Sequence, residues 1–288
     1  MGADCKSAGL AFSGSNPLPT TLLLNVEELQ EGLPVNNFAS TINTFLKSFN
    51  LELRKISSTP LRELFTRLKK SSIELHVIWD VGAYKGEWTR TVSQFCPESK
   101  FILFEPNLIH NNFLEVQGYD YYNLVLGNAN KTVKFYSHGG TGDSIYPEFD
   151  EKLEKRKNYR LVEMVKLDTL VNQRAKFPVP DFLKLDVQGA ELDVLSGAIK
   201  TLKDIKVILM ECPIVHYNWG SPDTSEYLSF MFSHDYIPFF VTEIHRLQQI
   251  VTQVDIAFVS AKVFAEKISP LQNVGFWKST TDKYLKNF

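Results

Sequence analysis

The chain has 288 residues, of which 44% are hydrophobic, so it can bury a sizeable core as one large domain or as one domain with an appended segment. Lys and Arg number 31 against 33 Asp and Glu, which gives a net charge of −2. Because so weak a field does not attract polyanions or anionic lipid, we expect no nucleic-acid partner.

The N-terminal residues and the cysteines bear on the compartment. The first residues lack the basic region and apolar run of a secretory signal, and Lys6 stands where a myristoylation signal has Ser or Thr. Cys5, Cys96 and Cys212 form no C-x-x-C pair, which argues against a disulfide framework or a zinc site. No run of about 18 apolar residues occurs. We therefore expect a cytoplasmic protein with no membrane span.

Composition divides the chain into three parts. Residues 1–21 are rich in Gly, Ser and Pro, which predicts a loosely ordered N-terminal segment. Residues 22–75 form a helical lead-in with two amphipathic patterns, "NNFASTINTFLKSF" and "PLRELFTRLKK", the second with Pro60 at a favoured first-turn position. Residues 76–288 form the main domain.

The main domain alternates between strand and helix patterns. Its short apolar runs are "HVIWDVG", "KFILFEP", "DYYNLVLGN", "FLKLDVQG" and "VILMECP", and the helical stretches between them include 87–95, 107–116 and 190–202. Continuous hydrophobicity is typical of strands buried on both faces. The order of strand, helix and strand predicts a doubly wound, mostly parallel α/β sheet.

The last two strand patterns differ from the others. "IPFFVTEIHRLQQI" and "VDIAFVSA" have no helical stretch between them, only a turn expected around residues 246–253. We predict an antiparallel C-terminal hairpin at the edge of the sheet, which separates this fold from an ordinary nucleotide-binding dehydrogenase.

The turn "DVGAYKG" follows the first strand, where ligands bind in doubly wound sheets. Gly82 lets the backbone pass close under a ligand, and Gly86 lets a helix begin whose N–H groups receive a carboxylate or phosphate. The spacing is G-x-x-x-G and misses the G-x-G-x-x-G dinucleotide fingerprint. A ligand with a smaller anionic end than a pyrophosphate is therefore favoured.

Glu105 ends the second strand, about twenty residues beyond the glycine turn, where an acid accepts hydrogen bonds from ribose hydroxyls. Asp80 ends the neighbouring strand. The alternative interpretation is a strand-capping Asp80 and a solvated Glu105, and the spacing alone does not decide between them.

Five segments in order, over roughly Val77 to Ala261, carry a resemblance: "DVGAYKGEWT", "FEPN", "VKLDTLV", "PDFLKLDVQGAELDVLSGA" and "VILMECP". Together they resemble the FkbM family of S-adenosylmethionine-dependent methyltransferases. Two positions depart from its commonest pattern, since Tyr84 stands where Asn is usual and Gln188 where Glu is frequent. The resemblance implies a Rossmann-like class I methyltransferase fold and S-adenosylmethionine as cofactor. The cofactor-binding residues that we expect are Asp80, Gly82, Ala83, Tyr84, Gly86, Glu105, Pro106, Ser144 and Asp186.

Methyl transfer to an oxygen requires a group that removes the acceptor's proton. Asp186 is the leading base, Glu211 ends the next strand, and Glu191 is either a third acid at the same mouth or a helix-start acid. His216, on the loop after "VILMECP", is the alternative base. Tyr217 and Trp219 beside it either form a platform for a sugar ring or belong to the core.

Three further features have two interpretations each. In the loop 137–147, Asp143 or Ser144 reaches the adenine or the acceptor, or the loop is a simple hairpin excursion. The charged run after it, residues 148–160, is favoured as a solvated helix over a lid. A magnesium site from Asp186, Glu191 and Glu211 has no recognised spacing, so we predict no metal.

The resulting prediction is an O-methyltransferase acting on a hydroxyl of a sugar, glycan or related metabolite, with a small-molecule or glycan acceptor as its partner. A non-catalytic nucleoside-binding module with the same fold is one alternative. A NAD-dependent oxidoreductase is another, although it needs the three-glycine fingerprint that this chain lacks.

Overall fold

The computed structural model describes residues 59–137, 140–148, 159–173, 175–216 and 218–271. The N-terminal segment, the first helical pattern of the lead-in and residues 149–158 of the charged run lie outside these ranges. The described residues from Pro60 onward belong to one compact unit.

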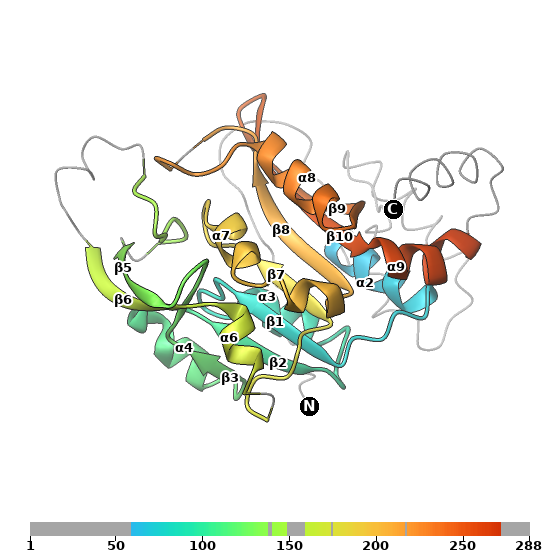
Figure 1. Ribbon diagram of the computed structural model, residues 1–288, viewed down its shortest axis with the longest axis horizontal. Helices are drawn as coiled ribbons and strands as arrows, with labels where there is room; N and C mark the ends of the chain where they lie inside the picture. The colour runs from blue at the N-terminus through green and yellow to red at the C-terminus, as the bar shows by residue number, and fades with distance from the viewer. Residues whose placement is uncertain (1–58, 138–139, 149–158, 174, 217, 272–288) are drawn as a thin grey trace, which may run out of the picture. The chain divides into compact units, whose positions relative to one another are not determined.

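Seven strands of this unit form one sheet (Figure 1). In spatial order they are β3 (Asp120–Tyr122), β2 (Lys100–Phe104), β1 (Val77–Val81), β7 (Phe182–Leu185), β8 (Val207–Pro213), β10 (Ile250–Ser260) and β9 (Tyr236–Leu247). The first five run parallel, whereas β10 is antiparallel to both of its neighbours. The predicted mostly parallel sheet with an antiparallel C-terminal hairpin is therefore confirmed. The turn between the two hairpin strands is shorter than expected, because it consists only of Gln248 and Gln249.

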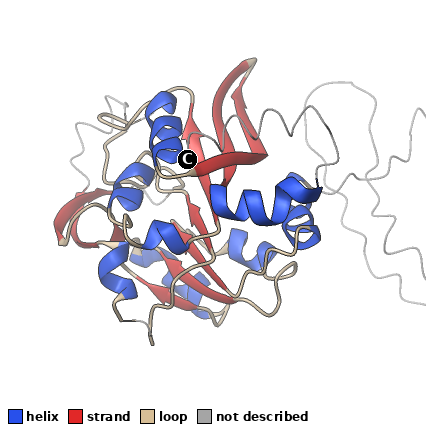
Figure 2. Cartoon of the chain, turned by 45° about the vertical axis from the view of Figure 1, so that its right-hand side comes forward, coloured by secondary structure: helices blue, strands red, loops and turns tan. Residues whose placement is uncertain are grey.

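Helices cover both faces of this sheet, as Figure 2 shows. They are α2 (Pro60–Lys70), α3 (Glu87–Val92), α4 (Asn111–Glu115), α6 (Leu167–Val171), α7 (Glu191–Ser196), α8 (Thr224–Ser233) and α9 (Ala261–Val263). Short helical turns accompany them, namely η2 (Leu108–His110), η3 (Thr201–Asp204), η4 (Phe264–Ile268) and η5 (Ser269–Leu271). Within the described ranges, no helix is both long enough and apolar enough to cross a membrane.

The predicted helices are shorter than their patterns. The stretch 190–202 divides at Gly197, where a Cβ would lie 2.0 Å from the carbonyl oxygen of Gly127. The chain passes so close to its neighbour at this point that only glycine fits. Asp223 is the N-cap of α8 and forms a capping box with Glu226. The side chain of Asp223 accepts a hydrogen bond from the backbone N–H of Glu226, and the side chain of Glu226 accepts one from the backbone N–H of Asp223.

Side chains alternate between two cores along each central strand. Trp79 and Leu183 pack with residues of α6, α7 and α8 on one face. Ile78 and Phe182 pack with residues of α2, α3 and α4 on the other. This two-sided burial is why the strand sequences are continuously apolar. Because successive side chains of a strand point to opposite faces, the alternation also tells which face of the sheet each strand residue occupies.

A second, three-stranded sheet was not predicted. It contains β4 (Val125–Leu126), β6 (Tyr159–Val165) and β5 (Lys131–Tyr136), in that order. The run "DYYNLVLGN", expected as one strand, divides so that β3 stays in the main sheet and β4 pairs with β6. Between them, Asn123 donates its side-chain amide to the carbonyl oxygen of Glu105, which fastens the break to the end of β2.

Candidate active site

A cavity of about 450 Å³ lies beyond the carboxyl ends of the parallel strands. Its two ends are formed by different groups of residues. The glycine-turn end includes Gly82, Ala83, Tyr84, Glu105, Pro106, His110, Asp143 and Ser144. The hairpin end includes Lys184, Asp186, Gln188, Glu211, Glu243, His245 and Asp255. The cavity thus brings together strand ends that are more than 150 residues apart in the chain.

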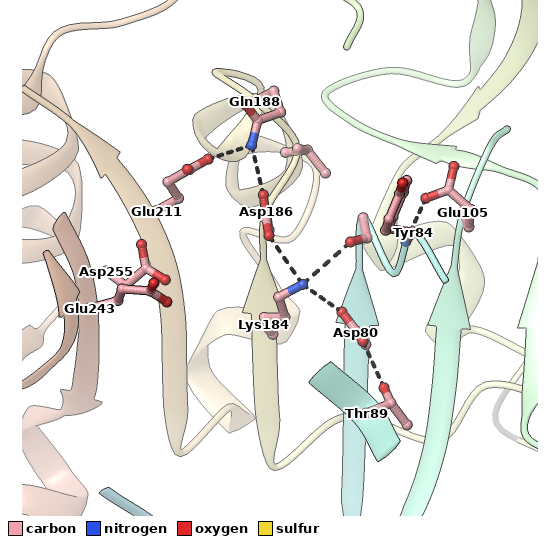
Figure 3. Close-up of polar contacts among 12 residues, drawn as sticks. Asp80, Tyr84, Thr89, Glu105, Lys184, Asp186, Gln188, Glu211, Glu243 and Asp255 are labelled. Atoms are coloured by element: carbon pink, nitrogen blue, oxygen red, sulfur yellow. Dashed lines mark hydrogen bonds and ion pairs between the residues drawn. The ribbon is translucent and has the colours of Figure 1, made fainter. Parts of the chain in front are cut away.

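Strand alternation places the polar side chains on one face. Asp80 and Lys184 share the face of Ile78 and Phe182, and they are direct neighbours across β1 and β7. Glu211, Asp255 and Glu243 are likewise opposite one another across β8, β10 and β9. Figure 3 shows this row of side chains.

Lys184 lines the cavity, and the sequence analysis gave it no role. Its side chain is 10% exposed, and its ammonium lies 3.0 Å from Asp80 Oδ1, 3.3 Å from the carbonyl oxygen of Gly82 and 3.4 Å from Asp186 Oδ2. Burial by itself favours the neutral amine, but the carboxylates of Asp80 and Asp186 outweigh it and raise the pKa of Lys184. A lysine within the apolar run "FLKLDV" was the available signal, because a lysine is almost never fully buried without a partner.

Asp80 lies below the cavity and does not line it. It is fully buried, one carboxylate oxygen pairs with Lys184, and the other accepts a hydrogen bond of 2.7 Å from the Thr89 hydroxyl. The structure thus differs from the expectation that Asp80 contacts the ligand. Asp80 holds Lys184 and the start of α3 in place.

The glycine turn is tightly fastened to its neighbours. Gly82 has φ +80°, and a Cβ there would lie 1.8 Å from the carbonyl oxygen of Asp186. This glycine therefore makes room for the end of β7, in addition to any room that it leaves for a ligand. Gly86 has φ +71° and is the N-cap of α3. Tyr84 has φ +50°, a left-handed conformation that Asn tolerates better than Tyr.

Glu105 is 5% exposed and joins the ends of β1 and β2. Its two oxygens accept hydrogen bonds from the backbone N–H groups of Tyr84, at 2.8 Å, and Asn107, at 2.7 Å. Burial raises its pKa to about 7, against these two hydrogen bonds, which lower it. A carboxylate has about four acceptor positions, so capacity for a ligand remains.

The loop before β6 closes the glycine-turn end. Asp143 accepts hydrogen bonds from the side chains of Asn107, at 2.6 Å, and Ser137, at 2.9 Å. Ser144 is 2% exposed, and its hydroxyl is within hydrogen-bond distance of the carbonyl oxygens of Val187 and Gln188. Both residues line the cavity, and both are held in place by hydrogen bonds to other residues of the protein. The carbonyl oxygen of Pro106 accepts a hydrogen bond from Arg160.

A chain of hydrogen bonds crosses the hairpin end (Figure 3). The side-chain amide of Gln188 donates to Asp186 Oδ1 at 2.8 Å and to Glu211 Oε2 at 2.7 Å. The amide nitrogen thereby separates two carboxyl groups that would otherwise repel. Burial, and then the charges of Asp186 and Glu191, raise the pKa of Glu211 well above its ordinary value.

Glu191 is fully buried at the first position of α7, away from the main cavity. It accepts hydrogen bonds from the backbone N–H groups of Val187, at 2.9 Å, and Gly189, at 3.1 Å, and from the Tyr227 hydroxyl, at 2.5 Å. Burial raises its pKa to about 7. Its partners make it the residue that shapes the turn after Asp186.

The histidine at the hairpin end is His245, which the sequence analysis did not consider. His216 is exposed, does not line the cavity and lies 3.5 Å from the Ser221 hydroxyl. Trp219 is 55% exposed, and Tyr217 lies outside the described residues. Ligand atoms of His245, Glu211 and Asp255 all lie within 4.8 Å of one another, so this trio could hold a metal ion. It shares only Glu211 with the acidic set weighed from the sequence.

The sheet order, the antiparallel hairpin and the cavity at the strand ends define a Rossmann-like class I methyltransferase fold. The model of one family, described as the methyltransferase FkbM domain, matches residues 80–238, which is more than half of the chain. The chain belongs to the FkbM methyltransferase family, and the resemblance seen in the sequence is confirmed.

Among curated proteins, the chain is similar to the 2-O-methyltransferase NoeI of Sinorhizobium fredii (strain NBRC 101917 / NGR234). The two are 24% identical over 202 residues, which is 64% of this chain and 79% of that protein. A putative O-methyltransferase from Klebsiella pneumoniae has a TM-score of 0.41 at 11% identity, over 82% of this chain and 94% of that one. An O-methyltransferase from Bacillus cereus in complex with SAH has a TM-score of 0.40 at 12% identity, over 82% and 95%. At TM-scores this low, the structural likenesses add nothing to the assignment of the site.

Proposed function

We propose that this methyltransferase uses S-adenosylmethionine to methylate a hydroxyl group of a sugar, glycan or related metabolite. The observation that carries the proposal is a single cavity with Glu105 at one end and the Asp186–Gln188–Glu211 chain at the other. One end suits a ribose, and the other suits a hydroxyl that must lose a proton. When bound, S-adenosylmethionine supplies a methyl group on a sulfonium.

At the glycine-turn end, the chain offers two kinds of contact to a nucleoside. Glu105 keeps acceptor capacity beyond its two backbone partners and is placed to accept hydrogen bonds from both ribose hydroxyls. The apolar atoms of Ala83, Pro106 and Ile145 line the same end and exclude water from the ligand. We assign Asp80 a positioning role, through Lys184 and Thr89.

At the hairpin end, we assign Asp186 the role of general base. Gln188 and Lys184 each hold one of its oxygens, at 2.8 and 3.4 Å, so that the carboxylate has one orientation. Its side chain is still 42% exposed, which leaves it accessible to an acceptor. A positioned base of this kind contributes about 10²–10⁴-fold to a rate.

The groups that line the hairpin end support this acceptor class. Carboxyl groups of Glu211, Asp255 and Glu243 and the imidazole of His245 surround Asp186 with hydrogen-bonding atoms. Such a wall suits an acceptor with several hydroxyls better than an apolar one. NoeI, a relative that is by its name a 2-O-methyltransferase, supports oxygen as the methylated atom.

Calorimetric titration with S-adenosylmethionine, S-adenosylhomocysteine and NAD tests the proposal. We expect the first two to bind and NAD not to bind. A screen of polyhydroxylated acceptors with methyl-labelled cofactor then tests transfer. Binding of NAD alone would contradict the proposal in favour of an oxidoreductase. Cofactor binding with no transfer to any acceptor would favour a nucleoside-binding module.

A further inference from the structure

His110 is a buried residue at the glycine-turn end to which no role has yet been given. It ends η2, directly before α4, and is 2% exposed. Among the described residues, neither Nδ1 nor Nε2 of its ring has a hydrogen-bond partner. The same residue contributes to the lining of the cavity, beside Tyr84, Glu105 and Pro106.

Two unpaired ring nitrogens are unusual in a folded core. Most buried side-chain polar atoms have a hydrogen-bond partner. A buried polar atom without one costs about 1–3 kcal/mol of folding free energy. Burial lowers the pKa of His110, so the ring is neutral and presents one N–H donor and one acceptor nitrogen. An imidazole of this kind fits a ligand that brings its own donor or acceptor.

The packing around His110 fixes the ring. Its centroid lies 4.3 Å from the ring centroid of Tyr84, in an edge-to-face arrangement. Tyr84 itself has φ +50°, a strained conformation for a bulky residue, and its backbone N–H binds Glu105. The aromatic pair and the carboxylate therefore form one connected unit at this end of the cavity.

We infer that His110 makes a hydrogen bond to the base of the bound nucleoside, with Tyr84 holding its ring in place. The inference rests on the proposed function, in which Glu105 binds the ribose. The base is attached to that ribose and must extend from Glu105 along the walls of the same end. A purine has ring nitrogens and an exocyclic amine at its edge. These groups can serve as the hydrogen-bond partner that the imidazole lacks.

The test compares two ligands that differ by the base. S-adenosylhomocysteine carries the adenine, whereas S-ribosylhomocysteine keeps the ribose and the amino-acid end without it. In His110→Phe, we expect the affinity for S-adenosylhomocysteine to fall about threefold to tenfold, the worth of one hydrogen bond. The affinity for S-ribosylhomocysteine should not change. Titration calorimetry measures both.

Two amide variants identify the nitrogen that binds. His110→Asn places an amide near the position of Nδ1, and His110→Gln places one near Nε2. We expect one of them to recover part of the lost affinity. His76→Phe is the matched control, because His76 is 71% exposed and precedes β1, at the opposite end of the strand from the cavity. Thermal unfolding establishes that each variant is folded.

A direct reading comes from the ring ¹⁵N resonances of labelled histidine. Those of His110 should shift with S-adenosylhomocysteine and stay in place with S-ribosylhomocysteine. Unchanged affinity in His110→Phe, equal weakening for both ligands, or no recovery in either amide variant would each overturn the inference. If the wild-type protein binds neither ligand, the proposed function fails, and the inference fails with it.

Discussion

Glu105 shows how the environment of one side chain sets its response to pH. Its oxygens bind two backbone N–H groups, yet burial still raises its pKa to about 7. A carboxylate accepts hydrogen bonds from both ribose hydroxyls, whereas a protonated carboxyl group has lost acceptor capacity. In the proposed complex, binding of the cofactor therefore favours the deprotonated form of Glu105.

We expect the affinity for S-adenosylhomocysteine to fall as the pH drops through about 7, by up to about tenfold per pH unit below it. The sign follows from the raised pKa, because below it a proton must leave before the hydroxyls can bind. Calorimetry from pH 8 to pH 5.5 measures the profile. Glu105→Ala should weaken binding at pH 8 by about 1–3 kcal/mol.

Glu105→Gln is the control for this profile, since it keeps the shape and cannot titrate. The affinity of that variant should be nearly independent of pH over the same range. Asp255, with a pKa raised by burial to about 6, and Glu191, with a pKa of about 7, titrate in this window as well. A profile that survives in Glu105→Gln would assign the pH dependence to them.

Tyr84 shows why a residue can depart from a family's usual choice. Its backbone is left-handed, and Asn is among the residues that tolerate this conformation best. The tyrosine contributes a side chain that packs on His110. The identity of residue 84 could be read from the sequence, but its contact with His110 depends on the fold.

At the scale of elements, the turn after β1 and the end of β7 are packed through Gly82. A Cβ at this position meets a backbone oxygen at 1.8 Å, and backbone cannot move aside as a flexible side chain can. We expect Gly82→Ala to lower the free energy of unfolding.

Gly118→Ala is the matched control for Gly82→Ala. Gly118 also has a positive φ, +73°, but its Cβ would meet nothing within 4 Å. Both variants bear the strain of a left-handed alanine, and only Gly82→Ala adds the clash. Urea unfolding should show Gly82→Ala less stable than Gly118→Ala by about 1–3 kcal/mol, the usual cost of overpacking. Equal losses would mean that the β7 end relaxes freely.

The adjacent strands β1 and β7 share the buried pair of Asp80 and Lys184. We expect Lys184→Met to lower the free energy of unfolding by about 3–5 kcal/mol, because it leaves a buried carboxylate without its cation. Adding Asp80→Asn to this variant should restore part of the loss. Urea unfolding at pH 7 measures both.

Lys100 and Asp120 provide the comparison for the buried pair. They also lie 3.0 Å apart, but their side chains are 45% and 50% exposed. Lys100→Met should therefore cost less than about 1 kcal/mol. If Lys184→Met costs no more than Lys100→Met, the buried pair does not stabilise the fold.

At the scale of the whole molecule, the strand patterns predicted the main sheet because its strands are buried on both faces. The antiparallel hairpin was predicted for a different reason, namely that no helix-length pattern separates its two strands. The small sheet was missed, because most residues of β5 and β6 are exposed or half-buried and neither strand has a continuous apolar run.

The candidate site was predicted in part. The positions at strand ends could be read from the sequence, and Gly82, Glu105, Asp186 and Glu211 do line one cavity. The contacts that these residues make could not be read from the sequence, because each contact depends on the register between strands that are far apart in the chain. Lys184 meets Asp80 across 104 residues, and the role of His245 depends on the pairing of β9 with β10.

Residues that lie far apart in the chain form the network that holds the side chain of Asp186, which we propose as the general base. Its carboxylate follows a rigid buried strand and is held by Lys184 and by Gln188, which also binds Glu211. His216 is exposed and lies outside the cavity. A base must hold its position relative to the acceptor, and this favours Asp186 over His216.

Asp186→Asn should therefore keep the affinity for S-adenosylmethionine and lower the rate of methyl transfer by about 10²–10⁴. The asparagine oxygen still accepts the hydrogen bond from Gln188, whereas the longer contact of the second carboxylate oxygen with Lys184, at 3.4 Å, is lost. His216→Ala should change the rate by less than about threefold, because its exposed ring is not held against the acceptor. Both rates are measured with methyl-labelled cofactor and the acceptor found by screening. Loss of cofactor affinity in Asp186→Asn would assign Asp186 to binding, and an inactive His216→Ala would make the histidine the base.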